Sequence, residues 1–151
     1  VTTVSYAGEA ENLPAQSASL TKIGNIYTDM YEKEAFDYYE TAAGLAEETS
    51  NYNLRGFVAS NTANAHLKFE DPEKALKSYS KAVKNYTTAE SPSKIAQNYV
   101  AAADIMVEFN NLNKAYNLLS KAQKYARQTE NINLMNEINT KMRQLSAIDV
   151  K

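Results

Sequence analysis

The side chains that carry most enzyme chemistry are scarce in this sequence. His66 is the only histidine and there is no cysteine, so no second ligand or base of these types can complete a metal site or a nucleophile–base pair. The acidic pairs Glu47-Glu48 and Glu70-Asp71 fall at the ends of predicted helices, where acidic residues are common. We therefore expect no enzymatic activity, no cofactor and no metal, and a structural place for His66 between packed helices.

Lysines, by contrast, recur with a regular spacing that could serve binding. One stripe, with spacings of three, four and three residues along a single helix, consists of Lys74, Lys77, Lys81 and Lys84. Part of it returns forty residues later as Lys114, Lys121 and Lys124. Such stripes are usually solvated faces, and the alternative is a convex docking surface for an acidic partner. RNA binding is disfavoured because the stripes lack exposed aromatic residues on which bases could stack.

The bulk composition narrows the class of protein. The 151 residues are 44% hydrophobic and 23% charged, with a net charge of −2, so there is no excess of basic charge for nucleic acid. No apolar run approaches the roughly 20 residues that a membrane span requires, and the first residues lack the pattern of a signal peptide. We expect a cytoplasmic protein with another protein or peptide as its partner, while the oligomeric state stays open.

Four glycines and three prolines over this length favour long helices joined by short turns. A small residue, a large apolar residue four positions on and an alanine seven positions on occur together three times, forty residues apart. The three sets are Ala35/Tyr39/Ala42, Ala75/Tyr79/Ala82 and Ala115/Leu119/Ala122. Another helical stretch with its own small residue precedes each set; these residues are Gly24, Ala63 and Ala103. Two helices per period form a hairpin that cannot bury its apolar face alone, so the copies must stack.

Capping residues place the helix boundaries. Asp71-Pro72 and Ser91-Pro92 each put an N-cap oxygen before a proline at the first helical position. The sequence predicts helices at about 14–30, 32–49, 53–69, 72–89, 92–109, 112–129 and 132–147. The first hairpin turn is one residue shorter than the other two, which should alter the packing there slightly.

Two groups of apolar residues are expected in the core. The last predicted helix carries an apolar stripe suited to covering the end of a stack, made of Leu134, Ile138, Met142 and Leu145. The tyrosines that fall on apolar faces of the repeat are Tyr27, Tyr39, Tyr79, Tyr99 and Tyr116.

The pattern resembles the tetratricopeptide repeat. Ile23-Gly24…Tyr27 matches the Leu-Gly…Tyr element of that repeat's first helix, and the alanine-containing sets match its second helix. The resemblance implies an all-α, right-handed α-solenoid of antiparallel helix hairpins, with about three repeats and a C-terminal capping helix. The forty-residue period is similar to that of spindle-orientation adaptors and bacterial peptide-responsive regulators, and more distantly to soluble NSF attachment proteins.

This resemblance divides the chain into three parts. Residues 14–130 form three hairpins, residues 131–151 form the capping helix and the C-terminus, and residues 1–13 form the tail of a preceding helix or a linker. Residues 7–13 resemble residues 46–52, the end of a second-type helix. We therefore hypothesise that the native protein is longer and carries a preceding repeat.

In this family the first helix of each hairpin lines a concave groove. Carried over by register, the peptide-binding residues are Thr21, Asn25, Ser60, Asn61, Asn64, Lys68, Val100 and Asp104. Asparagine offers both a donor and an acceptor, which suits gripping a peptide backbone. The alternative is that these are solvated polar positions. The family's carboxylate clamp is disfavoured, because Thr21 and Ala101 stand where the clamp needs Lys or Arg.

Three functions remain open. The leading hypothesis is an adaptor that binds an extended or helical segment of a partner protein along the groove. The runner-up is a regulatory or oligomerising segment of a larger signalling protein. A third possibility is an attachment-protein role in membrane fusion, with salt-sensitive contacts through the basic stripes.

Overall fold

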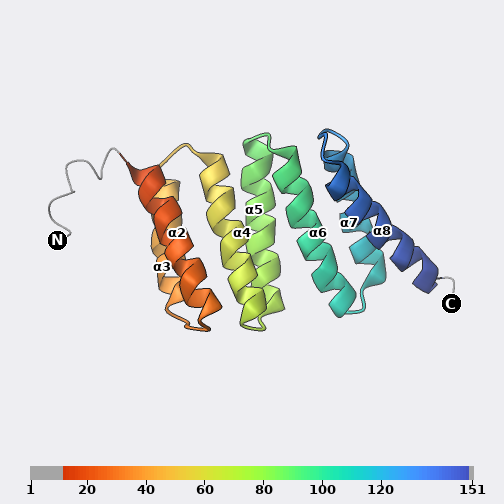
Figure 1. Ribbon diagram of the computed structural model, residues 1–151, viewed down its shortest axis with the longest axis horizontal. Coiled ribbons are helices and arrows are strands. Elements are labelled where there is room, and N and C mark those ends of the chain that lie inside the picture. The colour runs from red at the N-terminus through yellow and green to blue at the C-terminus, as the bar shows by residue number, and fades with distance from the viewer. Residues whose placement is uncertain (1–11, 150–151) are drawn as a thin grey trace. The chain divides into compact units, whose positions relative to one another are not determined.

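The computed structural model describes residues 12–149, and every regular element in that stretch is an α-helix (Figure 1). Contacts divide the described residues into two compact units between Asn85 and Tyr86, inside the last turn of α5. The helices are α2 (Leu13–Asp29), α3 (Ala35–Glu47), α4 (Tyr52–Lys68), α5 (Pro72–Thr88), α6 (Pro92–Glu108), α7 (Leu112–Ala126) and α8 (Ile132–Asp149). The predicted all-helical repeat fold is confirmed.

Within each unit, helices that are neighbours in the chain pack on one another. In the first unit α2 packs against α3, and α4 packs on both. In the second unit α7 packs against both α6 and α8. Figure 1 shows that successive helices of a unit run antiparallel, as expected for helical hairpins.

The residues that define the repeat form the core. All nine members of the three predicted sets are buried, with Tyr39, Tyr79 and Leu119 as the large side chains between alanines. Alanine on both sides lets the helix backbones approach closely, and the large residue fills the space between them. Of the predicted stripe on α8, Leu134, Ile138 and Leu145 are buried and Met142 is half-buried.

Side-chain caps begin most of these helices. The Asn51 side chain accepts from the Leu54 amide at 3.0 Å, and Asp71 accepts from the Lys74 amide at 3.2 Å. Asn111 and Asn131 cap α7 and α8 in the same way. Ser91 occupies the predicted N-cap position of α6, but its side chain makes no capping bond. Pro92, whose ring has no N–H and presets the helical φ, begins α6 there.

The second helix begins at Ala35, three residues later than predicted. Residues 32–34 form tight turns instead, in which the amides of Ala35, Phe36 and Asp37 each donate to a carbonyl three residues earlier. This turn has one residue fewer than its two counterparts. The backbone therefore adopts tighter, three-residue hydrogen-bonded turns, which bring Ala35 to the same place in its repeat as Ala75 and Ala115. The later helix start is a change in the backbone, and the expected change in packing stays a prediction.

Four helix ends turn through a left-handed residue that is not glycine: Tyr31, Glu70, Glu90 and Asn110 have φ between 54° and 59°. Each turn has the same paired hydrogen bonds. At Glu70, its own amide donates to the Leu67 carbonyl at 3.0 Å, and the Asp71 amide donates to the His66 carbonyl at 2.8 Å. The bonds satisfy the last carbonyls of the helix, while the side chain makes the conformation costly.

Two other turns share a different construction, eighty residues apart. The Thr49 hydroxyl donates to the Ala46 carbonyl at 2.7 Å and accepts from the Asn51 amide. Thr129 and Asn131 repeat this arrangement after α7. Thr and Asn two residues apart thus both end one helix and cap the next.

The predicted tail at residues 1–13 lies almost wholly outside the described residues. The first described helix begins at Leu13.

The approach of α2 to α3 depends on Gly24. A Cβ atom there would lie 2.6 Å from Cε1 of Tyr39 and 2.9 Å from two further ring atoms. Tyr39 cannot easily move, because it is 2% exposed and its hydroxyl is hydrogen-bonded to Thr28 and Asn25. Gly44, on α3, has nothing within 4 Å of the same position.

We expect opposite effects of the same substitution at these two glycines. Gly24→Ala should lower the free energy of unfolding by about 1–3 kcal/mol through overpacking. Gly44→Ala should raise it by about 0.5–1 kcal/mol, since alanine loses less backbone entropy in a helix. Urea denaturation followed by circular dichroism measures both, and a stabilised Gly24→Ala protein would contradict the packing described.

Glu70→Gly should stabilise the protein by about 1 kcal/mol, because glycine adopts the left-handed conformation without steric cost. Asn110→Gly is the matched control: asparagine tolerates this conformation, so a smaller gain is expected. Thermal unfolding of both variants tests this, and equal shifts in Tm would show that strain at Glu70 is not the cause.

Candidate functional site

Four of the six predicted groove residues of the first unit line one cavity. It has a volume of about 300 Å³ and lies on the side of the unit formed by α2 and α4, here called the inner face. Its lining includes Asn25 and Asp29 from α2 and Asn61, Asn64 and Lys68 from α4. The structure therefore brings together four residues proposed from sequence: Asn25, Asn61, Asn64 and Lys68.

A chain of hydrogen bonds fixes the asparagines of this inner cavity. The Tyr39 hydroxyl donates to Oδ1 of Asn25 at 2.7 Å, and Nδ2 of Asn25 donates to Oδ1 of Asn61 at 2.9 Å. Asn61 in turn donates to the Phe57 carbonyl at 2.7 Å. Burial raises the pKa of Tyr39, so its hydroxyl stays protonated as the donor. Both amide groups are thus held in one orientation.

The other two residues of the cavity are more accessible. Asn64 is exposed, and its Oδ1 accepts a hydrogen bond from the Tyr79 hydroxyl of α5. Lys68 forms an ion pair with Asp29 at 3.3 Å, and its ammonium lies 4.9 Å from the ring centroid of Tyr31. The Asp29 side chain is 78% exposed, so this ion pair contributes little to stability. A charged group of a partner could therefore replace either member of the pair.

Thr21 does not face the groove, and the prediction for it is wrong. Its side chain is fully buried, and its hydroxyl donates to the Ser17 carbonyl at 2.9 Å. The reason is helical geometry: residues three apart share a face, and Gly24 faces α3. Val100, three residues before the buried Ala103, is buried for the same reason.

The remaining predicted groove residues do not line this cavity. Ser60, three residues before Ala63, is half-buried on α4. Asp104 is exposed on α6 in the second unit, and its carboxylate accepts from the ammonium of Lys141 on α8 at 2.8 Å. This bond attaches the last helix to α6 and partly neutralises the acidic position.

The first lysine stripe divides between two environments. Lys74 and Lys81 line a larger depression of about 650 Å³ in the first unit, whereas Lys77 and Lys84 do not. Lys74 pairs with Asp71 at 3.3 Å and Lys81 pairs with Glu47 at 3.4 Å. The depression lies between α3 and α5 on the opposite side of the unit from the inner cavity, here called the outer face, and α4 forms its floor. We name it the outer groove.

In the second unit, two of the three stripe lysines lie against tyrosines. The ammonium of Lys121 is 5.8 Å from the Tyr99 ring centroid, and that of Lys124 is 6.0 Å from the ring of Tyr125. Lys114 is exposed on the first turn of α7. Tyr116 was expected in the core but is 41% exposed, because it is one residue, about 100° around the helix, from the buried Ala115.

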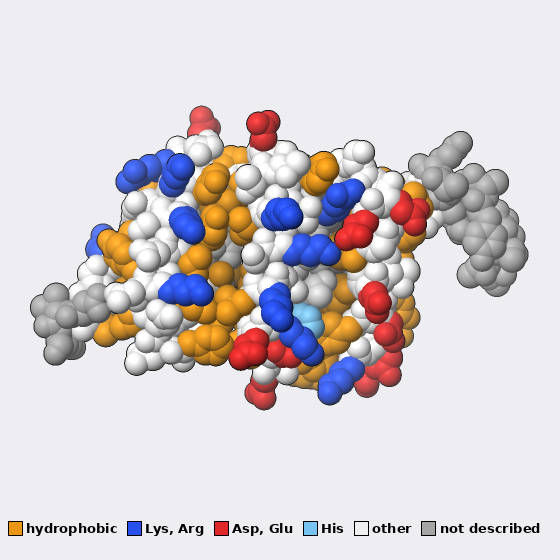
Figure 2. Space-filling model, turned by 180° about the vertical axis from the view of Figure 1, so that it is seen from behind, with side chains coloured by type: hydrophobic (Ala, Val, Ile, Leu, Met, Phe, Trp, Pro, Cys, Tyr) orange, Lys and Arg blue, Asp and Glu red, His pale blue; other side chains and the backbone are white. Residues whose placement is uncertain are grey.

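The outer groove is the feature that sequence reasoning missed. Figure 2 shows this face: acidic side chains gather along one side of the first unit and lysines lie beside them, with hydrophobic side chains between. The groove arises because α3 and α5 both contact α4 while a space remains between them. No local pattern in either helix signals it.

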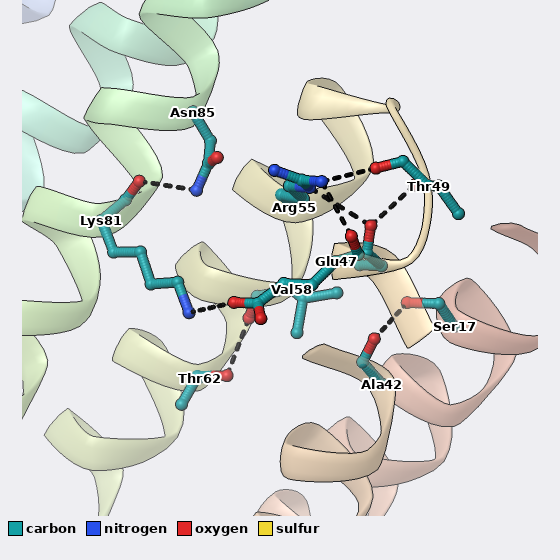
Figure 3. Close-up of polar contacts among 10 residues, drawn as sticks. Ser17, Ala42, Glu47, Thr49, Arg55, Val58, Thr62, Lys81 and Asn85 are labelled. Carbon is teal, nitrogen blue, oxygen red and sulfur yellow. Dashed lines mark hydrogen bonds and ion pairs between the residues drawn. The ribbon is translucent and has the colours of Figure 1, made fainter. Parts of the chain in front are cut away.

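Arg55 closes one end of the outer groove. Its guanidinium donates to three carbonyl oxygens at the end of α3, those of Ala46 at 3.2 Å, Glu47 at 2.9 Å and Thr49 at 2.6 Å (Figure 3). A cation at a helix C-terminus also opposes the negative end of the helix dipole. The equivalent position eighty residues on holds Met135, whose side chain cannot donate these hydrogen bonds.

His66 lies at the other end of the outer groove. It is half-buried and stacks on Phe36, with 4.5 Å between ring centroids. Burial lowers its pKa below the ordinary value of 6.5; Asp71 opposes the effect and Lys74 adds to it. Among the described residues no group of three histidine or acidic side chains could hold a metal ion with it.

We expect stability to fall as the pH drops below about 6.5. The unfolded chain protonates His66 at a higher pH than the folded chain does, so acid favours unfolding between the two pKa values. His66→Gln should flatten the dependence of the unfolding free energy on pH between 7.5 and 5.5. Urea titrations measure the slope, NMR titration of the single histidine reports its pKa, and an unchanged slope would contradict the assignment.

Comparison with known proteins supports the broad form of the resemblance seen in the sequence. A family model described as soluble NSF attachment protein, SNAP, matches residues 5–151. No curated protein sequence shows significant similarity to the chain. Among residues 12–149 no helix combines the length and apolar character needed to cross a membrane.

The match does not support the closer resemblance to spindle-orientation adaptors and peptide-responsive regulators, which stays a prediction. It supports instead the resemblance to soluble NSF attachment proteins, which the sequence suggested as the more distant one. That family consists of helical adaptors of membrane trafficking. The match extends over nearly the whole length, and the described part is built only of helical hairpins. The chain belongs to the soluble NSF attachment protein family.

Proposed function

We propose that this protein is an adaptor of the membrane-fusion machinery that holds a segment of a partner protein along its inner face. One observation carries the proposal: Asn25, Asn61, Asn64 and Lys68, from two different helices, line a single cavity. The family's name describes attachment to NSF, and an adaptor of this kind must offer binding surfaces on a stable scaffold. The hydrogen bonds of Asn25 and Asn61 lower the ordering cost of binding, because these amides are already oriented.

The roles of the cavity residues differ under this proposal. Asn25 and Asn61 are positioning residues, since their amides bind one another and the Tyr39 hydroxyl. Asn64 and Lys68 are the contact residues: the amide of Asn64 donates to a backbone carbonyl of the partner, and Lys68 exchanges Asp29 for a partner carboxylate. A lysine–carboxylate pair this exposed is worth little to the free protein, so the exchange costs little.

The sharpest test replaces the donor of Asn64 without disturbing its bond to Tyr79. Asn64→Asp keeps the acceptor oxygen for the Tyr79 hydroxyl but removes the amide donor. We expect the affinity for purified NSF, measured by biolayer interferometry, to fall about tenfold, which corresponds to about 1.4 kcal/mol. Asn117→Asp, the same change on α7 of the second unit, should leave it unchanged.

The possible results distinguish an error about the binding site from an error about the proposed attachment to NSF. If NSF binds the wild-type protein and Asn64→Asp binds equally well, the inner cavity is not the contact surface. If NSF does not bind at all, the proposed attachment to NSF is wrong. Circular dichroism of each variant confirms that helicity is intact.

A further inference from the structure

The outer groove is long enough for about three turns of helix. On α3 its lining runs from Phe36 to Glu47, a distance of about 17 Å at the helical rise of 1.5 Å per residue. The opposite wall is α5, from Lys74 to Lys81, and the floor is α4. All of these elements belong to the first unit.

The floor of the groove suits close approach of another helix. Small side chains on the floor and on both walls let a second backbone come near; they are Ala59 and Thr62 on α4, Ala43 and Ala46 on α3, and Ser78 on α5. At the end near the α4–α5 turn, Phe36, His66 and Phe69 form an aromatic cluster, with Phe36 and Phe69 centroids 5.5 Å apart. A large apolar side chain of a partner would fit against that cluster.

The helical parts of the two walls carry opposite charges, whereas Lys33 and Asp71, which also line the groove, precede α3 and α5. Glu40 and Glu47 lie on the α3 wall, and Lys74 and Lys81 lie on the α5 wall. Lys81 and Glu47 reach across to one another at 3.4 Å, but their side chains are 53% and 61% exposed (Figure 3). Such a pair contributes little to stability, so a partner's charges can replace it.

We propose that the outer groove binds an amphipathic helix of a partner protein, about three turns long, whose apolar stripe is flanked by basic residues on one side and acidic residues on the other. The basic flank faces Glu40 and Glu47, and the acidic flank faces Lys74 and Lys81. The apolar stripe contacts the small residues that line the groove, in the helix-in-groove mode of recognition. This surface is separate from the inner cavity and does not depend on it.

Opposite charge on the two walls also sets the direction of the bound helix. Reversing the helix exchanges its flanks, which would place acids against Glu40 and Glu47 and bases against Lys74 and Lys81. Like charges at such contacts disfavour the reversed orientation. The groove therefore selects both a charge pattern and a polarity.

A matched pair of substitutions on α5 tests whether the groove is the site. The probe is a fluorescein-labelled synthetic helical peptide with a leucine stripe, a lysine flank and a glutamate flank, titrated with the full chain by fluorescence anisotropy. Ser78→Trp fills the groove and should weaken binding at least tenfold. Ser80→Trp, on the same helix but outside the groove and exposed, should leave binding unchanged.

Charge reversal provides a second test that does not alter the packing. Lys74→Glu/Lys81→Glu makes both walls acidic, so the probe should bind more weakly and a peptide with lysine on both flanks should bind more tightly. The control is Lys77→Glu/Lys84→Glu, which changes the net charge equally but replaces no residue that lines the groove. Equal effects of the two double variants would show that only overall charge matters and would overturn the proposal.

Other results would also overturn it. They are failure of the probe to bind the wild-type chain, or equal binding to Ser78→Trp and Ser80→Trp. A dimer in sedimentation equilibrium that Ser78→Trp dissociates would show that a second copy of the chain, not a partner helix, occupies the groove. Asn64→Asp should leave probe binding intact, which distinguishes failure here from failure of the inner-face function.

Discussion

The packing of α2 on α3 depends on one tyrosine. Tyr39 fills the space opposite Gly24, where even a methyl group would clash with its ring. Its hydroxyl is then buried among apolar groups and needs polar partners, which Thr28 and Asn25 provide. The same residue therefore closes the core and orients the first amide of the inner cavity. Tyr79 repeats this arrangement with Asn64, one period later.

This connection changes how the asparagines of the inner face are understood. In the sequence they are polar residues at positions with which the repeat family binds peptides. In the structure two of them first satisfy buried or neighbouring polar groups, since Asn25 bonds to Tyr39 and Asn61. A polar ladder of this kind specifies a unique packing as well as a binding surface. Loss of binding after replacing Asn25 would not by itself distinguish these two roles.

The sequence allowed the fold to be predicted because its strongest signals are local. Alanines and large apolar residues at fixed spacing identify the buried faces, and Asn51, Asp71 and Pro92 mark helix starts. The site was only partly predictable. Thr21 was misplaced because a register taken from family resemblance ignored the face it shares with Gly24. The outer groove could not be predicted, because it is a space between α3 and α5, which are not neighbours in the chain.

The left-handed residue that ends α2 has a consequence for how neighbouring hairpins stay aligned. Tyr31 adopts a backbone conformation that glycine would occupy without strain, yet its ring lies edge-on to Phe69, with 6.3 Å between centroids, and beneath the ammonium of Lys68. Both partners belong to the end of α4. A glycine would relax the chain at this point but would remove the latch between the tips of two adjacent hairpins. The strained backbone at Tyr31 thereby places its ring where it links the end of α2 to the end of α4.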